Sequence, residues 1–213
     1  AFTQTIQHRE VYKKQTGGKG KFADIEFTMG PAEDGVQGLQ FVDEVKGGVI
    51  PREFIQATEK GFKGALTNGV LAGFPVENLK VTLTDGSFHP VDSDALSFET
   101  AAHIAFKEAG LKAGAILMEP VMRVEIHCPD EYLGDVTGDL NKKRSILREV
   151  IADIGFQVIK ADVPLAEMFG YITQLRSLTS GRATFNMELS HYAPVPEALA
   201  DVVIKKAKGL LFI

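Results

Sequence analysis

The chain has 213 residues, 45% of them apolar, and its 23 Lys and Arg side chains against 28 Asp and Glu give a formal net charge of −5. This length can build one large or two small cores, and the mild acidity means that any polyanion must be bound by local basic clusters rather than by a global field. No apolar run approaches the ~20 residues of a membrane helix and no signal peptide precedes the first expected strand, which predicts a soluble protein. A single cysteine, Cys128, excludes an internal disulfide and a cysteine-based metal site, and fits a reducing cytoplasm.

Alternating apolar segments and helix signals organise the first half of the chain. Strands are expected at residues 2–12, 22–29, 37–46 and 76–83. Helices are expected at residues 51–68 and 94–110. The second helix follows a turn-rich loop at residues 85–93, with Asp92 or Ser93 as its expected cap. The glycine-containing segment 110–114 is the best candidate for a domain boundary.

The second half predicts the element order β-α-β-β-α-β, which is the ferredoxin-like pattern. Strands are expected at residues 117–127, 145–152, 156–163 and 182–191. Helices are expected at residues 129–144, 165–178 and 196–208. Residues 147–151 could equally continue the preceding helix, and the pattern leaves both possibilities open.

A basic, glycine-rich stretch joins the first two expected strands. Residues 8–22 carry five basic side chains against one acidic side chain, a local net charge of +4. Lysines on a flexible turn suit a phosphate-bearing partner, although a solvated hairpin tip would have the same composition. A Walker A loop is excluded because neither Lys19 nor Lys21, the lysines that follow glycines here, precedes Ser or Thr.

The histidines offer few catalytic constellations. His127 and Cys128 are neighbours near the end of an expected strand, so their side chains point to opposite faces, which disfavours a thiolate–imidazole pair. His89 with Asp85, Asp92 and Asp94 could form a metal cluster or a general-base pair, but these carboxylates serve equally well in turns and helix caps. No partner spacing that suggests a site occurs around His8, His103 or His191.

The loop that carries His89 also carries an aromatic side chain. Gly86, Pro90 and Ser93 would let this loop project Phe88 and His89 outward, where they could stack on bases and hydrogen-bond to a nucleic-acid backbone. The alternative is a buried Phe88 beside a histidine that faces solvent.

Long motifs spread over essentially the whole chain resemble the closing part of bacterial translation elongation factor G. They are AEMFGYITQLRSLTSGRA at residues 166–183, EPVM at 119–122, GDV and GDL at 134–136 and 138–140, GGVIP at 47–51, and GSFH and VDS at 86–89 and 91–93. The chain also starts at Ala1 without a methionine, so we expect a fragment of a longer protein.

The resemblance implies an α+β fold of two domains, the fourth and fifth domains of that factor. Residues 1–114 would form a ribosomal-protein-like α/β domain with a left-handed βαβ crossover, residues 115–194 a ferredoxin-like βαββαβ domain, and residues 195–213 a C-terminal helix. The chain would then be no enzyme by itself and would need no cofactor or metal. GTP and Mg would belong to the missing N-terminal domain of a ribosome-dependent GTPase.

The resemblance also implies a partner, the ribosome, and a monomeric, cytoplasmic protein. A tip of the first domain would enter the decoding region of the small subunit and act on transfer and messenger RNA, and the second domain would sit near the factor-binding centre of the large subunit. The tip residues expected to contact RNA are Lys13, Lys14, Gln15, Thr16, Gly17, Gly18, Lys19, Gly20, Lys21, Ser87, Phe88, His89, Val91 and Asp92. The expected function is ribosomal translocation. A ribosome-splitting or tetracycline-protection paralogue and an RNA-binding enzyme that uses His89 with Asp92 are the alternatives.

Overall fold

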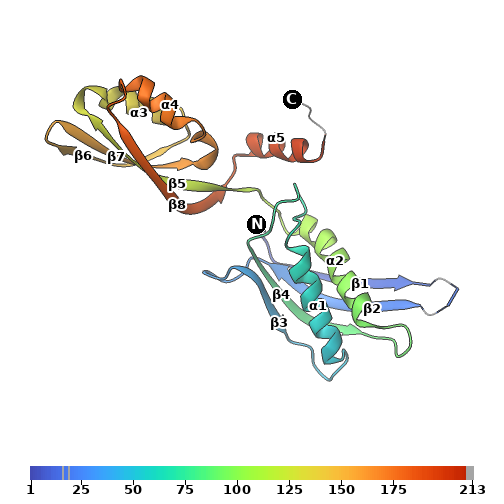
Figure 1. The fold of residues 1–213 in the computed structure, drawn as a ribbon. Helices are drawn as coiled ribbons and strands as arrows, with labels where there is room; N and C mark the ends of the chain where they lie inside the picture. Colours follow the sequence, from blue (N-terminus) through green and yellow to red (C-terminus); the bar gives the residue numbers. More distant parts are fainter. Residues whose placement is uncertain (16, 19, 210–213) are drawn as a thin grey trace. The chain divides into compact units, whose positions relative to one another are not determined.

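The computed structural model describes residues 1–15, 17–18 and 20–209. They divide into two compact units, Ala1–Leu117 together with the segment that starts at Pro196, and Met118–Val195 (Figure 1). Each unit is built on a four-stranded sheet, which confirms the α+β class. Within the described part of the chain, no helix combines the length and the apolar character that a membrane span requires.

The first unit is a sheet with two helices on one face. Its elements are β1 (Ile6–Lys14), β2 (Lys21–Gly30), β3 (Gly38–Asp43), α1 (Arg52–Ala65), β4 (Asn78–Ser87) and α2 (Ala95–Lys112). The strand order is β1-β2-β4-β3, with β3 parallel to β4 and the other two pairs antiparallel. A parallel pair needs a crossover connection, and α1 supplies it between β3 and β4. The left-handed sense of this crossover stays a prediction.

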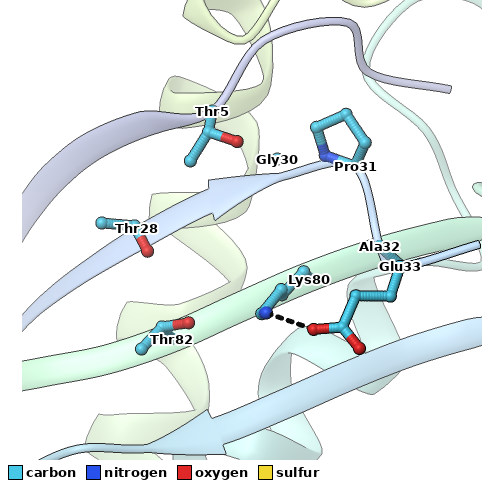
Figure 2. A pocket seen from close by; sticks show the side chains of 8 residues that line it. All are labelled: Thr5, Thr28, Gly30, Pro31, Ala32, Glu33, Lys80 and Thr82. Atoms are coloured by element: carbon cyan, nitrogen blue, oxygen red, sulfur yellow. Dashed lines mark hydrogen bonds and ion pairs between the residues drawn. The ribbon is translucent and has the colours of Figure 1, made fainter.

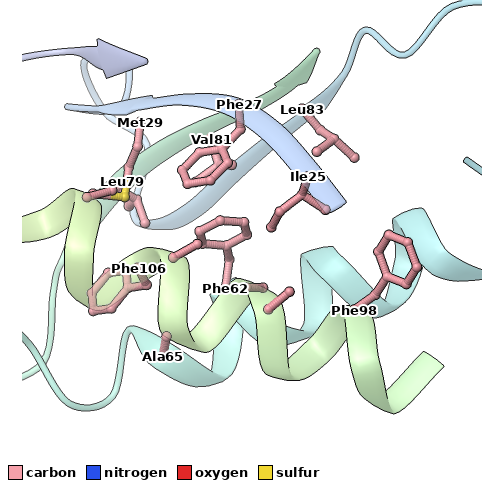
Figure 3. Close-up of a cluster of buried hydrophobic side chains, with 14 of the residues drawn as sticks. Ile25, Phe27, Met29, Phe62, Ala65, Leu79, Val81, Leu83, Phe98 and Phe106 are labelled. Atoms are coloured by element: carbon pink, nitrogen blue, oxygen red, sulfur yellow. The ribbon is translucent and has the colours of Figure 1, made fainter. Parts of the chain in front are cut away.

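The core of the first unit lies between the sheet and its two helices (Figure 3). Alternate positions of β2 and β4 point toward the helices and are fully buried, as period-two alternation requires: Ile25, Phe27, Met29, Leu79, Val81 and Leu83. From α1, the ring of Phe62 meets Phe27 edge to face at 5.0 Å. The helices themselves approach closely, because a Cβ at Gly61 would lie 2.6 Å from the carbonyl oxygen of Glu99. This packing fixes the ends of β4 and α2, and therefore the loop between them.

The second unit has the ferredoxin-like order that the sequence predicts. Its elements are β5 (Met118–Pro129), α3 (Leu133–Asn141), β6 (Ile146–Asp153), β7 (Phe156–Pro164), α4 (Tyr171–Leu178) and β8 (Thr184–Pro194). The strand order is β6-β7-β5-β8 and all pairs are antiparallel. The final helix, α5 (Glu197–Ala207), follows the second unit in the chain but groups with the first, and it buries none of its residues.

The structure resolves one open alternative in the second unit and corrects two expectations. Residues 147–151 lie in β6, paired with β7, which confirms the expected strand and not the continued helix. The helix expected from residue 129 starts only at Leu133, because β5 runs through Pro129 and a 3-10 turn follows. The helix expected over residues 165–178 is also split, since Gly170 adopts a left-handed φ of 74° and α4 begins after it.

The structure also moves the boundary of β4. The sequence predicts a strand that ends at residue 83 and a loop from residue 85, but β4 continues to Ser87. Its last part pairs with β2, where Gly86 lies opposite Ile25. A Cβ at Gly86 would lie only 2.2 Å from the carbonyl oxygen of Asp24, so this pairing depends on the glycine. The exposed loop is therefore shorter than expected and begins at Phe88.

Candidate nucleic-acid interface

The structure brings together the two loops that the sequence analysis singled out. The backbone N–H of Gly20, at the end of the β1–β2 loop, donates to Asp92 Oδ1 in the β4–α2 loop at 3.0 Å, across 72 residues of sequence. The N–H of Phe22 donates to the Asp92 carbonyl at 2.9 Å. In the opposite direction, Ser93 Oγ donates to the Phe22 carbonyl at 2.8 Å. Asp92 and Ser93 therefore join the two loops into one surface.

The glycine at this junction is required by space. A Cβ at Gly20 would lie 3.0 Å from Asp92 Cγ, so a side chain there would require the carboxylate to shift by a few tenths of an ångström. Gly20 is buried. It thus positions the loop, and offers an RNA partner little surface.

Lys21 is held by an aspartate at the start of α2. Its ammonium group donates to Asp94 Oδ2, and Asp94 Oδ1 accepts from the backbone N–H of Ser97 at 2.8 Å. Asp94 is therefore the N-cap of α2, where the sequence analysis expected Asp92 or Ser93. Burial opposes ionisation of Asp94, but the hydrogen bonds from Lys21 and Ser97 outweigh it and lower its pKa to about 2.

His89 uses one ring nitrogen to hold its own loop. Nδ1 accepts from the backbone N–H groups of Val91 at 3.3 Å and Asp92 at 3.1 Å. The loop is closed further by the His89 N–H, which donates to Ser93 Oγ at 2.8 Å. A neutral ring that accepts at Nδ1 carries its proton on Nε2, and 52% of the side chain is exposed. The arrangement presents an Nε2–H donor to the surroundings.

The same arrangement disfavours a catalytic pair of His89 with Asp92. In such a pair a carboxylate accepts the Nδ1–H of the imidazole and orients the ring. Here Asp92 Oδ2 lies 3.5 Å from Nδ1, and that nitrogen already accepts from two backbone groups. The aspartate instead fastens the neighbouring loop through Gly20.

Phe88 is neither fully buried nor fully projected outward, the two possibilities that the sequence left open. Its ring packs against Phe54 of α1 with the centroids 6.0 Å apart, yet 39% of the residue stays exposed. Val91 is 62% exposed on the same loop. The β4–α2 loop therefore offers a partly supported aromatic ring, an exposed aliphatic side chain and the donor of His89.

Ser87 and Arg9 belong to a polar cluster on the face of the sheet that the helices leave open. Ser87 Oγ donates to Asp24 Oδ2 at 2.7 Å, and Arg9 donates to both oxygens of that carboxylate at 2.9 and 2.7 Å. Burial opposes ionisation of Asp24, but these hydrogen bonds dominate and hold its pKa below the ordinary value. The hydroxyl of Ser87 is therefore used within the sheet, and the positive charge of Arg9 is neutralised by Asp24.

Two of the five basic side chains of residues 8–22 are paired in the structure: Arg9 of β1 with Asp24, and Lys21 of β2 with Asp94. Among the described residues, Lys13 and Lys14 enter no ion pair, and both are exposed. Also exposed are Gln15, Gly17 and Gly18. Thr16 and Lys19, which the sequence analysis also selected, lie outside the described residues.

A hollow opens at the other end of the same sheet (Figure 2). It is lined by Thr5, Thr28, Gly30, Pro31, Ala32, Glu33, Lys80 and Thr82. Its two charged side chains neutralise each other, with Lys80 Nζ 2.7 Å from Glu33 Oε1. None of the residues selected for the tip lines this hollow.

Among the remaining histidines, the structure confirms the expectation for His127 and Cys128. Cys128 is buried while His127 is exposed and lies 2.8 Å from Glu125, so the pair does point to opposite faces. Burial also raises the pKa of the Cys128 thiol, which disfavours a thiolate. His8, for which no partner was expected, has two carboxylates near it. The alternation along β1 places Glu10 on its face, but the partner from α2 could not be found from sequence spacing.

Comparisons with known proteins agree over both units. A family model for "Elongation factor G, domain IV" matches residues 1–114, and one for "Elongation factor G C-terminus" matches residues 116–203. An elongation factor G from Amoebophilus asiaticus (strain 5a2) is 60% identical over 209 residues, which are 98% of this chain and 30% of that protein. One from Cytophaga hutchinsonii is 56% identical over the same shares.

A solved structure resembles the chain as well. A crystal structure of a protein from Thermus thermophilus superimposes with a TM-score of 0.86 at 38% identity, over 98% of this chain and 31% of that one. The chain therefore spans less than a third of the length of these relatives.

Proposed function

The chain belongs to the elongation factor G family, as domain IV followed by the C-terminal region, and we propose that it forms the working end of a ribosomal translocase. In this proposal it promotes the movement of transfer and messenger RNA through the ribosome. GTP and Mg are handled by a separate GTPase domain of the longer protein. The chain itself acts by contact rather than by chemistry.

One observation carries the proposal: Asp92 joins the two tip loops through hydrogen bonds. A surface that must stay in place against a moving RNA duplex has to be rigid, since a flexible loop would lose conformational entropy on binding. The hydrogen bonds from Gly20 and Phe22 to Asp92 hold the β1–β2 loop against the β4–α2 loop before any partner arrives. Both loops then rest on the packed sheet and helices of the first unit.

The exposed groups at this end have separate tasks in the proposal. Lys13 and Lys14 bind phosphates of ribosome-bound RNA, each as a point charge. His89 donates from Nε2, and Phe88 offers an aromatic face to a base or a ribose. Together they occupy the place that the moving RNA pair vacates and block its return, as a wedge does. Lys21 and Ser87 support this surface from inside.

The other partners of the proposal follow from family membership. The second unit docks near the factor-binding centre of the large subunit, while the tip reaches the decoding region of the small subunit. The longer protein works as a monomer in the cytoplasm.

The test replaces His89 by Ala in a full-length elongation factor that carries this chain as its C-terminal part. We expect single-round translocation to slow by about tenfold. The variant loses one neutral N–H donor to RNA, and one such hydrogen bond contributes about 1–1.5 kcal/mol. Ribosome-stimulated GTP hydrolysis should stay nearly unchanged. Equal loss of both activities would refute the division of labour between tip and GTPase domain.

A matched control keeps the result specific to the tip. His103 is an exposed histidine on α2, in the same unit but outside the tip, so His103→Ala should leave both rates unchanged. The alternative paralogues are tested with the same unmutated protein. A factor that displaces tetracycline or separates subunits without moving the transfer RNAs would contradict the translocase assignment.

A further inference from the structure

A cluster of one imidazole and two carboxylates lies on the helix-covered side of β1, outside the tip. His8 Nε2 is 3.6 Å from Glu10 Oε2 and 3.8 Å from Glu108 Oε2. The three ligand atoms lie within 4.8 Å of one another. Two of the residues are on one face of β1, and Glu108 comes from α2, which packs against that strand. The cluster therefore joins a strand to a helix.

The imidazole at its centre has a buried nitrogen with no partner. The His8 side chain is only 9% exposed, and its Nε2 makes no hydrogen bond to any described residue. The ring is fixed by an edge-to-face contact with Phe27 at 5.8 Å. A buried polar atom without a partner is costly and calls for an explanation, and an ion is one of the ordinary explanations. Both carboxylates lie beside this nitrogen.

We propose that His8, Glu10 and Glu108 bind a divalent transition-metal ion, with Zn²⁺ as the ion that fits best. Bonds of about 2.0–2.1 Å in tetrahedral geometry place ligand atoms about 3.3 Å apart. The observed separations of 3.6 and 3.8 Å need only a small contraction. The longer one involves Glu108, whose side chain is 57% exposed and therefore free to move toward His8. The fourth position is left for water.

The donor set separates this ion from the common alternatives. Zn²⁺ accepts both imidazole nitrogen and carboxylate oxygen as ligands, whereas Mg²⁺ and Ca²⁺ favour six or more oxygens. Two carboxylates and a neutral imidazole also carry two negative charges, which a divalent ion compensates. Bound metal would tie β1, the strand that leads into the β1–β2 loop, to α2.

The site is independent of the proposed function. His8 lies six residues before Lys14 along β1, which is on the order of 20 Å of extended strand. Loss of the metal would therefore leave the groups at the tip in place, and failure of the translocation experiment would say nothing about the metal site.

The experiment is calorimetric titration of the tag-free 213-residue chain with ZnCl₂. We expect one ion per chain with a dissociation constant in the micromolar range or below, and an increase of several degrees in the melting temperature. Glu108→Gln should weaken binding at least tenfold and abolish the melting shift. This variant keeps the shape of an exposed side chain, so it folds, and MgCl₂ should give no signal in either protein.

The matched control is His127→Gln, which removes the exposed histidine beside Glu125 in the second unit. It should leave the Zn²⁺ titration unchanged. Replacement of Zn²⁺ by Co²⁺ gives a second readout, the visible absorption of tetrahedral cobalt, which Glu108→Gln should remove. Absence of binding below millimolar Zn²⁺, or binding that persists in Glu108→Gln and disappears in His127→Gln, would overturn the proposal.

Discussion

The two loops at the tip of the first unit differ in how they are built. The β4–α2 loop is closed from within, since the ring and the N–H of His89 bond to Val91, Asp92 and Ser93. The described part of the β1–β2 loop is fastened only where it re-enters the sheet, at Gly20. One loop is thus a preformed scaffold that needs no partner to hold its shape. The other loop takes its position from the first, and it follows the exposed lysines at the end of β1, Lys13 and Lys14, which display charge.

Because of this difference, we expect substitutions in the two loops to have different effects, one on stability and one on RNA binding. A change in the scaffold should cost stability, because its groups are bonded to the protein. Substitution of the exposed lysines that display charge, Lys13 and Lys14, should lower the affinity for RNA and leave stability unchanged, because these side chains are exposed. The variants below test that separation, beginning with the scaffold.

Gly86→Ala should give the largest effect. The new Cβ would lie 2.2 Å from the Asp24 carbonyl and 2.6 Å from Ile50 Cδ1, so β2 and β4 would have to separate where the scaffold loop begins. We expect a loss of about 3 kcal/mol in the free energy of unfolding, the upper part of the range for overpacking. Urea unfolding followed by circular dichroism measures it.

The control for that variant is an alanine at a glycine with free space. Gly138 lies in α3 with nothing within 4 Å of a built Cβ, so Gly138→Ala should stabilise its unit by about 0.5–1 kcal/mol through helix propensity. Equal destabilisation by both alanines would show that the close approach at Gly86 is not what holds the scaffold.

Asp94→Ala should have the second largest effect. It removes the N-cap of α2, worth about 1 kcal/mol, and an ion pair with the partly exposed Lys21, worth at most about 1 kcal/mol. The expected loss in the free energy of unfolding is therefore up to about 2 kcal/mol. Asp94→Asn keeps a capping oxygen and should lose about half as much. An alanine variant as stable as the wild type would show that the link between the loops contributes nothing.

Asp94 also predicts a dependence of stability on pH. Its pKa in the folded protein is about 2, below the ordinary value of 3.8. A carboxyl with a lowered folded-state pKa contributes its full stability above the unfolded value, and loses it as the pH falls toward the folded value. The difference in unfolding free energy between wild type and Asp94→Asn should thus be constant above about pH 5 and shrink between about pH 4 and pH 2. A difference that stays constant down to pH 2 would contradict the lowered pKa.

The sequence predicted the element order of both units and the positions of the two loops that Asp92 joins, because apolar periodicity and turn residues are local signals. The role of these loops as a tip was implied only by the family resemblance and stays a prediction. It did not predict which loop residues are bonded inward. Asp94 and Lys21 are 73 residues apart, and Ser87 meets Asp24 only because β4 extends beside β2. The cap of α2 was misplaced by one or two positions, since three capping side chains stand in a row and the packing of α2 decides among them. Pairing across the fold, and not composition, decides which lysines remain exposed.

The smallest effect on stability is expected for the exposed lysines at the end of β1, where the β1–β2 loop begins. Replacement of Lys13 and Lys14 together by Gln should change the free energy of unfolding by less than about 0.5 kcal/mol, because both side chains are exposed. Binding to small ribosomal subunits should weaken, and the slope of log affinity against log salt should fall by roughly 0.7–0.9 for each lost phosphate contact. The matched control replaces Lys107 and Lys112, exposed lysines of α2, and should leave the slope unchanged. If both double variants lower the slope equally, the charge that binds RNA is spread over the unit and the role proposed for Lys13 and Lys14 is wrong.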